Sequence, residues 1–182
     1  MKNLEALNRL QVASETQLIF DNMQKAIGMI PNLYAVAANS QAGLKALLGL
    51  GETLKGGNFT GKEEEAIALA VGQTNECGYC LSAHTALAKM RGFSEEETIG
   101  IRTGEIADAT IKALTDLARE ITTTRGFPRQ VIVDRFLEAG YSKGALVDLI
   151  GHVALNTFTN YLNHIADTEI DFPVAPSLSQ AA

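Results

Sequence analysis

The stretch CGYCLSAH at residues 77–84 contains the only two cysteines of this 182-residue chain, spaced C-x-x-C and followed by a histidine. On a helix, Cys77, Cys80 and His84 occupy positions i, i+3 and i+7 and therefore share one face. Two neighbouring thiols can cycle between dithiol and disulfide or bind a metal, and the imidazole can move a proton in both cases. The stretch therefore predicts thiol chemistry on a helix.

The sequence outside this stretch is also typical of helices, because good helix formers are abundant and no segment alternates with the period of a strand. Capping-box patterns stand at 60–63 and 94–97, and Gly92, Gly126 and Gly140 stand where helices are expected to end. We therefore predict an all-α fold. The expected helices lie at about 15–28, 32–38, 40–55, 61–74, 77–91, 94–103, 107–124, 129–139 and 142–168.

Length and composition fit a single domain over residues 1–182, since a chain that is 46% hydrophobic can bury a sizeable core and no linker divides it. The core is expected at about 28–168, followed by an extended or frayed tail over 171–182 that contains two prolines. A weak repeat at an offset of 82 residues makes Thr60 and Ser142 open equivalent helices. The repeat suggests that a helical unit has been duplicated.

Charge and hydropathy exclude several classes of partner. The net charge of −6 and the pI near 5.1 argue against nucleic acid and anionic membrane surfaces. No apolar run is long enough to span a bilayer, and the N-terminus lacks the apolar region of a signal peptide. A cytoplasmic location is therefore expected, and there a C-x-x-C pair is more often redox-active or metal-binding than structural.

Glu65 is the fourth candidate site residue. Thr74 and Asn75 are N-cap residue types directly before the C-x-x-C pair, which predicts a chain break at about 75–76. The resulting antiparallel helical hairpin places Glu65 within a turn of His84. The cysteines then lie in the first turns of a helix, where the macrodipole and free amides favour a thiolate.

Together, Glu65, Cys77, Cys80 and His84 form the pattern E-x11-C-x2-C-x3-H. This pattern resembles the alkylhydroperoxidase D-like group of the carboxymuconolactone decarboxylase family. The segments IPNLY at 30–34 and GFS at 92–94 are similar to the peroxidase-related members of that group. The resemblance covers roughly residues 28–168 and implies an all-α fold built from a duplicated helical unit. It also implies a homo-oligomer, commonly a trimer or hexamer.

The resemblance implies a role for each site residue. Cys80 would be the peroxidatic thiol that attacks a hydroperoxide, and Cys77, the more exposed of the two, would resolve the sulfenic acid to a disulfide. Glu65 and His84 would form a proton relay. No bound cofactor or metal is expected, and the partners would be a hydroperoxide substrate and a thiol or lipoyl-type reductant. This chemistry agrees with the nucleophilicity of thiolates and the ready condensation of sulfenic acids with thiols.

One position departs from the family pattern, and three other functions remain open. Tyr79 stands between the cysteines, where some members have a second histidine. The four site residues could instead hold zinc, or the thiols could serve as a redox-sensing switch in a non-enzymatic helical module. A lyase of the carboxymuconolactone decarboxylase type is the least favoured alternative, because the true decarboxylases lack the cysteine pair.

The remaining polar residues of the last expected helix are not assigned to the site. Asn156, Asn160 and Asn163 recur at helical spacing and are interpreted as polar surface, with an oligomer contact as the alternative. His152 and His164 are interpreted as structural.

Overall fold

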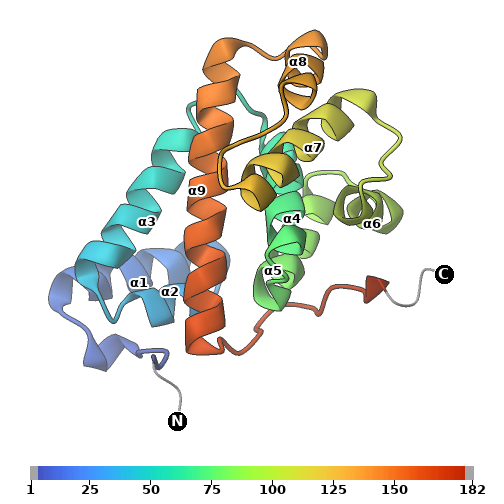
Figure 1. Cartoon of the computed structure of the whole chain (residues 1–182). Coiled ribbons are helices and arrows are strands. Elements are labelled where there is room, and N and C mark those ends of the chain that lie inside the picture. Colours follow the sequence, from blue (N-terminus) through green and yellow to red (C-terminus); the bar gives the residue numbers. More distant parts are fainter. Residues whose placement is uncertain (1–3, 179–182) are drawn as a thin grey trace.

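The computed structural model describes residues 4–178, and within this range the chain forms helices and no strands (Figure 1). The helices are η1 (Arg9–Gln11), α1 (Ser14–Ile27), α2 (Asn32–Ala37), α3 (Gln41–Leu54), α4 (Gly61–Thr74), α5 (Gly78–Met90), α6 (Glu95–Thr103), α7 (Ala109–Thr124), α8 (Gln130–Glu138) and α9 (Lys143–Ala166). The all-α prediction is confirmed, and every predicted α-helix is present with its ends within two residues of the expected bounds. None of the helices is long and apolar enough to cross a membrane, as far as the described residues extend.

Helix α4 lies at the centre of the fold. Every residue from Ala66 to Gly72 is buried, so this helix is covered on all sides rather than along one stripe. Helices α5, α7 and α9 pack around it, as Figure 1 shows. The central position of α4 fixes the place of Glu65, which it carries one turn from its start.

The long helix α9 runs beside α4 in the same direction. Tyr141 Oη donates a hydrogen bond to Glu63 Oε1 at 2.7 Å near the starts of the two helices, and Asn75 Nδ2 donates to Asn160 Oδ1 at 2.8 Å near the end of α4. A hydroxyl N-cap opens each helix, as the repeat predicted. The two copies differ after that point, because α9 continues without a break where the first copy reverses into α5.

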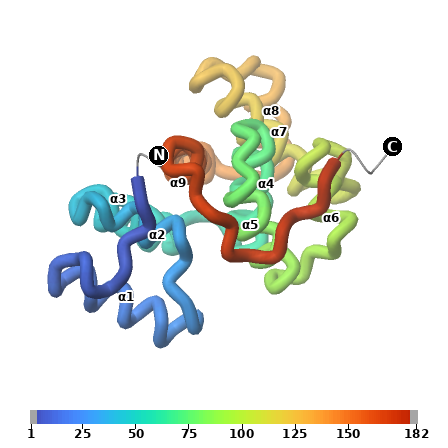
Figure 2. Tube along the Cα trace, turned by 90° about the horizontal axis from the view of Figure 1, so that it is seen from below, coloured from blue at the N-terminus to red at the C-terminus, as the bar shows by residue number. Residues whose placement is uncertain are grey.

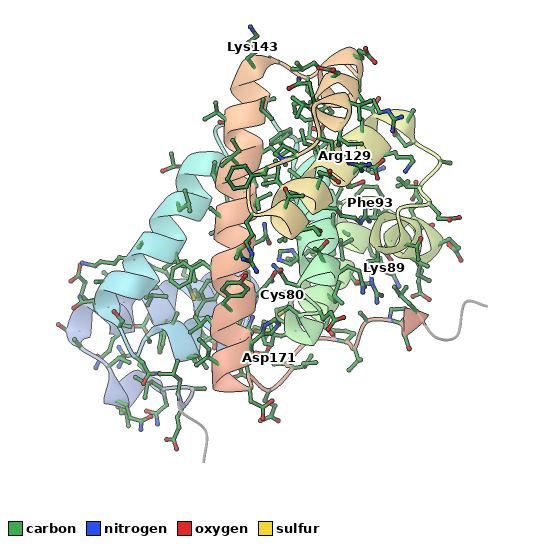
Figure 3. The ribbon with its side chains drawn as sticks, viewed as in Figure 1. Cys80, Lys89, Phe93, Arg129, Lys143 and Asp171 are labelled. Atoms are coloured by element: carbon green, nitrogen blue, oxygen red, sulfur yellow. The ribbon has the colours of Figure 1, made fainter. Side chains whose placement is uncertain are left out.

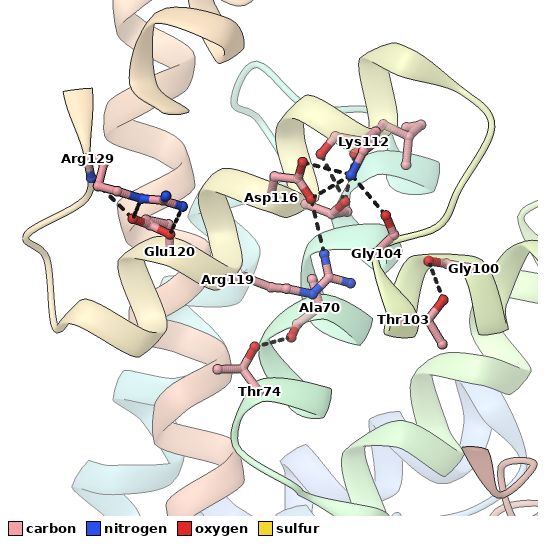
Figure 4. Close-up of polar contacts among 12 residues, drawn as sticks. Ala70, Thr74, Gly100, Thr103, Gly104, Lys112, Asp116, Arg119, Glu120 and Arg129 are labelled. Carbon is pink, nitrogen blue, oxygen red and sulfur yellow. Dashed lines mark hydrogen bonds and ion pairs between the residues drawn. The ribbon is translucent and has the colours of Figure 1, made fainter. Parts of the chain in front are cut away.

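The chain break before the cysteines is confirmed, but its predicted N-caps are wrong. The hydroxyl of Thr74 donates to the carbonyl of Ala70 inside α4, as Figure 4 shows, and the side chain of Asn75 is bonded to Asn160. The N-cap of α5 is Cys77, whose sulfur accepts from the backbone N–H of Cys80.

A Schellman-type end produces the reversal. The N–H of Cys77 donates to the carbonyl of Gly72 at 2.9 Å, and the N–H of Glu76 donates to the carbonyl of Gln73 at 3.1 Å. Glu76 adopts a φ of 56°, the left-handed conformation that this motif requires. A non-glycine residue there is uncommon, so the local sequence gives little sign of the motif. By contrast, Gly92, Gly126 and Gly140 have positive φ at helix ends, as predicted.

An ion pair joins the outer helix α7 to the start of α8. Arg129 at the start of α8 binds both carboxylate oxygens of Glu120 on α7, at 2.6 and 3.1 Å (Figure 4). Within α7, Arg119 lies 3.6 Å from Asp116. These contacts are remote from the cysteines and serve the scaffold.

The C-terminal tail crosses the end of the hairpin and packs there (Figure 2). Asn32 N donates to Asp171 Oδ2 at 2.7 Å, Ala175 N donates to Ser82 Oγ at 3.2 Å, and Arg102 Nη1 donates to the carbonyl of Pro176 at 2.7 Å. Residues 171–177 form no helix, and hydrogen bonds tie the tail to α2, α5 and α6. The predicted tail residues 179–182 lie outside the described range.

Candidate active site

The two cysteines lie side by side at the start of α5. Cys77 is the N-cap and Cys80 is in the first turn, and both are free thiols. The thiol of Cys77 donates to Cys80 Sγ at 2.9 Å. A disulfide bond is about 2.05 Å long, so a small movement of the sulfurs would join them.

Helix α9 supplies polar groups to the Cys80 sulfur. Asn163 Nδ2 donates to Cys80 Sγ at 3.3 Å, and Thr159 Oγ1 lies 3.9 Å from the same sulfur. The interpretation of Asn156, Asn160 and Asn163 as polar surface is wrong, because all three side chains are buried. They are buried because α9 turns this face toward α2, α4 and α5.

These contacts shift the pKa values of the two thiols in opposite directions. The hydrogen bond from Cys77 lowers the pKa of the Cys80 thiol, against the effect of burial, and the charge of His84 and the amide of Asn163 act in the same direction. The hydrogen bond to Cys80 and burial raise the pKa of Cys77. These effects favour the thiolate at Cys80 and the protonated thiol at Cys77.

The prediction that Cys77 is the more exposed cysteine is wrong. Its relative exposure is 1% and that of Cys80 is 2%. Leu33 and Tyr79 pack with both cysteines, and Phe172 of the tail joins this cluster, with its ring edge-on to Tyr79 at 5.8 Å. Figure 3 shows Cys80 beside α9, above the tail residue Asp171. The tail thus covers the cysteine end of the hairpin, which local sequence patterns do not reveal.

Glu65 and His84 are paired across the hairpin. Glu65 Oε2 lies 2.7 Å from His84 Nδ1, and both side chains are mostly buried. Burial lowers the pKa of His84, but the charge and hydrogen bond of Glu65 outweigh it and raise the pKa overall. The antiparallel packing of α4 on α5 thus places Glu65 beside His84, as the hairpin predicted.

Tyr79 is directed away from this pair. Its hydroxyl accepts a hydrogen bond from Leu33 N at 3.2 Å, and its ring packs against Phe172. Burial raises the pKa of the phenol, so it remains a neutral group. Tyr79 therefore holds α2 and the tail against the cysteines and does not replace a histidine in a proton relay.

A cavity of about 610 Å³ borders the Glu65–His84 pair. Glu65, His84 and Thr159 line it, whereas neither sulfur does. Since Thr159 Oγ1 lies 3.9 Å from Cys80 Sγ, the reactive sulfur is next to the cavity wall. Most of the remaining wall is apolar, with side chains from α2, α3, α5 and α9: Leu33, Leu47, Leu48, Leu87 and Leu155.

Two residues of this cavity were missed from the sequence. His152 is 5% exposed and lines the cavity together with Glu64, so its interpretation as merely structural overlooked its position. A signal was available, because His152, Asn156 and Thr159 stand at i, i+4 and i+7 on one face of a largely apolar helix. Among residues 4–178, no three His, Cys, Asp or Glu side chains are placed to hold a metal ion together.

The helical fold is similar to that of the alkylhydroperoxidase AhpD core, and two free thiols stand at the start of α5. The model of the carboxymuconolactone decarboxylase family matches residues 41–124, which include α3 to α7 and all four candidate site residues. The family resemblance drawn from the sequence motif is thereby confirmed. No curated protein matches the chain at a significant level.

Solved structures show the same fold at low sequence identity. The alkylhydroperoxidase AhpD core of a peroxidase-related protein from Ralstonia eutropha JMP134 has a TM-score of 0.84 at 17% identity, covering 93% of this chain and 92% of that one. A peroxidase-related protein from Silicibacter sp. TM1040 has a TM-score of 0.77 at 22% identity, covering 92% of both chains. A cysteine-to-alanine variant of the debrominase Bmp8, in complex with 2,3,4-tribromopyrrole, has a TM-score of 0.79 at 18% identity, covering 94% of this chain and 92% of that one.

Proposed function

We propose that the protein is a thiol-dependent peroxidase that reduces organic hydroperoxides through a Cys77/Cys80 dithiol–disulfide cycle. The observation that carries the proposal is the asymmetry of the two sulfurs. Cys80 accepts hydrogen bonds from Cys77 and Asn163 and favours the thiolate, while Cys77 keeps its proton 2.9 Å away. A thiolate nucleophile beside a neutral resolving thiol is the arrangement that a two-cysteine peroxidase needs.

The chemistry would proceed in two balanced steps. The Cys80 thiolate attacks the terminal oxygen of ROOH, the O–O bond breaks, and Cys80 becomes a sulfenic acid as RO⁻ leaves. His84, paired with Glu65, lies at the cavity wall and would give the leaving alkoxide its proton, forming ROH. The thiol of Cys77 then attacks the sulfenic sulfur, which forms the Cys77–Cys80 disulfide and releases water.

An external dithiol reductant would close the cycle by thiol–disulfide exchange. The attacking thiolate must reach one sulfur of the disulfide, and both cysteines are buried beneath Leu33, Tyr79 and Phe172. Reduction would therefore require the tail to move from the cysteine end of α5.

A homo-oligomer is part of the proposal and rests on an exposed apolar stripe along α9. Large apolar side chains recur on the outer face of this helix at spacings of three, eight, three and four residues, and each is at least 40% exposed. The stripe consists of Val147, Ile150, Phe158, Tyr161 and Ile165. A second copy of the chain would cover it.

The fold alone does not define the reaction, because Bmp8 shares it and is a debrominase. The proposal therefore depends on the cysteines, and two single substitutions test it. With a hydroperoxide and a recycling dithiol, Cys80→Ser should abolish peroxide consumption, and Cys77→Ser should stop after one turnover with an added oxygen on Cys80. Undiminished consumption by Cys80→Ser would contradict the assignment of the nucleophile.

The same samples separate the alternatives that the sequence left open. Zinc that is bound by the wild type and absent from the two cysteine variants would favour the metal site. Stoichiometric oxidation without recycling would favour a redox-sensing module. Lactone decarboxylation that persists in Cys80→Ser would favour the lyase.

A further inference from the structure

A second imidazole–carboxylate pair lines the cavity and has no part in the thiol chemistry described above. His152 on α9 and Glu64 on α4 both face the cavity, with His152 Nε2 4.0 Å from Glu64 Oε1. That distance is too long for a hydrogen bond. His152 Nε2 is buried and has no hydrogen-bond partner among the described residues. A buried nitrogen left unpaired at a cavity wall is available to a ligand.

The cavity also carries a carboxylate that has no cationic partner among the described residues. Glu65 is paired with His84. Glu64 has only His152 beside it, and burial lowers the pKa of that imidazole, which favours its neutral form. Burial and the charge of Glu65 raise the pKa of Glu64, and Lys55 and Arg91, which lie beyond ion-pair distance of it, do not offset this effect. Lys55 also lines the cavity, but its ammonium group donates to Glu52 Oε2 at 2.9 Å.

The position of His152 and Glu64 determines how long a ligand must be to reach them from Cys80. His152 precedes Thr159 by seven residues on α9, which separates them by about 10 Å along the helix axis. Thr159 lies beside Cys80. Leu155 of the apolar wall lies on α9 between His152 and Thr159. A ligand whose reactive end is near Cys80 would therefore rest its body on leucines and place its far end near His152 and Glu64.

Resting on the proposed peroxidase function, we propose that Glu64 and His152 determine which hydroperoxides the site accepts. The accepted substrate has an apolar body and an uncharged polar group at its far end, which forms a hydrogen bond with His152 Nε2. A substrate with a carboxylate at that end is disfavoured by the charge of Glu64, which has no cation within ion-pair distance, because like charges at close range repel.

Binding of product alcohols tests the inference without any redox step. The probes are 2-phenyl-2-propanol, its para-methyl ester and its para-carboxylate, titrated calorimetrically into the reduced full-length protein at neutral pH. The ester should bind roughly tenfold more tightly than the carboxylate. Equal affinities, or no binding of any probe, would overturn the inference, whatever the protein does with peroxides.

Two variants assign the effect to these residues. Glu64→Gln should reduce the ratio of ester to carboxylate affinity severalfold, whereas Glu138→Gln, which removes an equal charge from an exposed site outside the cavity, should leave it unchanged. His152→Phe should remove the advantage of the ester over the unsubstituted alcohol. An unchanged ratio in Glu64→Gln would refute the charge-based selection.

The corresponding cumene hydroperoxides then connect selection to turnover. Single-turnover oxidation of the thiols should be faster with the para-methyl ester than with the para-carboxylate. If the alcohols bind in the predicted order but no hydroperoxide oxidises the thiols, the proposed function fails while the cavity selectivity stands. Equal oxidation rates for the two hydroperoxides would refute the selectivity alone.

Discussion

Glu65 Oε2 lies 2.7 Å from His84 Nδ1, although 19 residues separate them in the sequence. The pair is created by the reversal between α4 and α5, which packs the first turns of α4 against the middle of α5. Because Glu65 raises the pKa of His84, the imidazolium persists to higher pH, and its positive charge in turn lowers the pKa of Cys80. The reactivity of the sulfur is thereby linked to a carboxylate on another helix.

Glu65→Gln should shift the pH dependence of thiol oxidation to higher pH. Without the carboxylate, His84 loses its proton at lower pH, and the thiolate of Cys80 then forms only at higher pH. The oxidation rate at neutral pH should fall on the order of tenfold or more. Stopped-flow oxidation across a pH series measures this, with Glu138→Gln as the control, and an unchanged profile would remove Glu65 from the relay.

Asn163→Ala should reduce the thiolate population of Cys80. The variant loses the donor 3.3 Å from the sulfur, and a hydrogen bond to a charged group contributes about 1.5–3 kcal/mol. The titration of ultraviolet thiolate absorbance should move to higher pH. Thr157→Ala, on the same helix but without a contact to the sulfur, is the control. A titration identical to that of the wild type would show that the amide does not stabilise the thiolate.

Glu76→Gly should stabilise the protein. Glu76 holds a φ of 56°, where an L-residue is strained and glycine is not, and the exchange should add about 0.5–1 kcal/mol to the free energy of unfolding. Glu76→Ala removes the same charge but keeps the strain, so it should show no such gain. Denaturant unfolding of both variants measures the difference. A less stable Glu76→Gly would contradict the role of backbone strain.

Phe172→Ala should accelerate reduction of the Cys77–Cys80 disulfide. The substitution removes the ring that packs on Tyr79 over the cysteine cluster, so a small dithiol should reach the sulfurs severalfold faster. Val174→Ala, at a highly exposed position of the same tail, is the matched control. If both variants are reduced at the wild-type rate, the tail does not limit access.

Ile165→Glu should weaken self-association through α9. Ile165 is 60% exposed on the apolar stripe, and a charge there would be buried without a partner in an interface between two copies. Leu10→Glu places the same charge at an exposed apolar residue of η1, outside the stripe. Sedimentation velocity of the variants and the wild type decides, and an unaltered oligomer in Ile165→Glu would place the interface elsewhere.

The helices could be predicted from the sequence because their signals are local. The capping boxes at Thr60 and Ser94 and the glycines at 92, 126 and 140 act within a few residues of their own positions. The Glu65–His84 pair could also be predicted, since it requires only that two consecutive helices pack as an antiparallel hairpin.

The unpredicted features depend on contacts between distant segments. Asn163 reaches Cys80 across 83 residues, and Phe172 covers the cysteine cluster from the tail. The helical spacing of the polar residues marks one face of α9, but it does not specify that this face meets the hairpin, so the buried asparagines resembled surface ones. The left-handed backbone conformation of Glu76 could not be predicted, because it is imposed by the packing of α5 on α4 and not by a glycine.

The most direct test of the proposed thiol cycle is the intact mass of the reduced, metal-free protein before and after one equivalent of cumene hydroperoxide. The cycle predicts the loss of two hydrogens, located by peptide mapping to a disulfide between Cys77 and Cys80. An unchanged mass, or an oxygen that remains on one sulfur without disulfide formation, would contradict it.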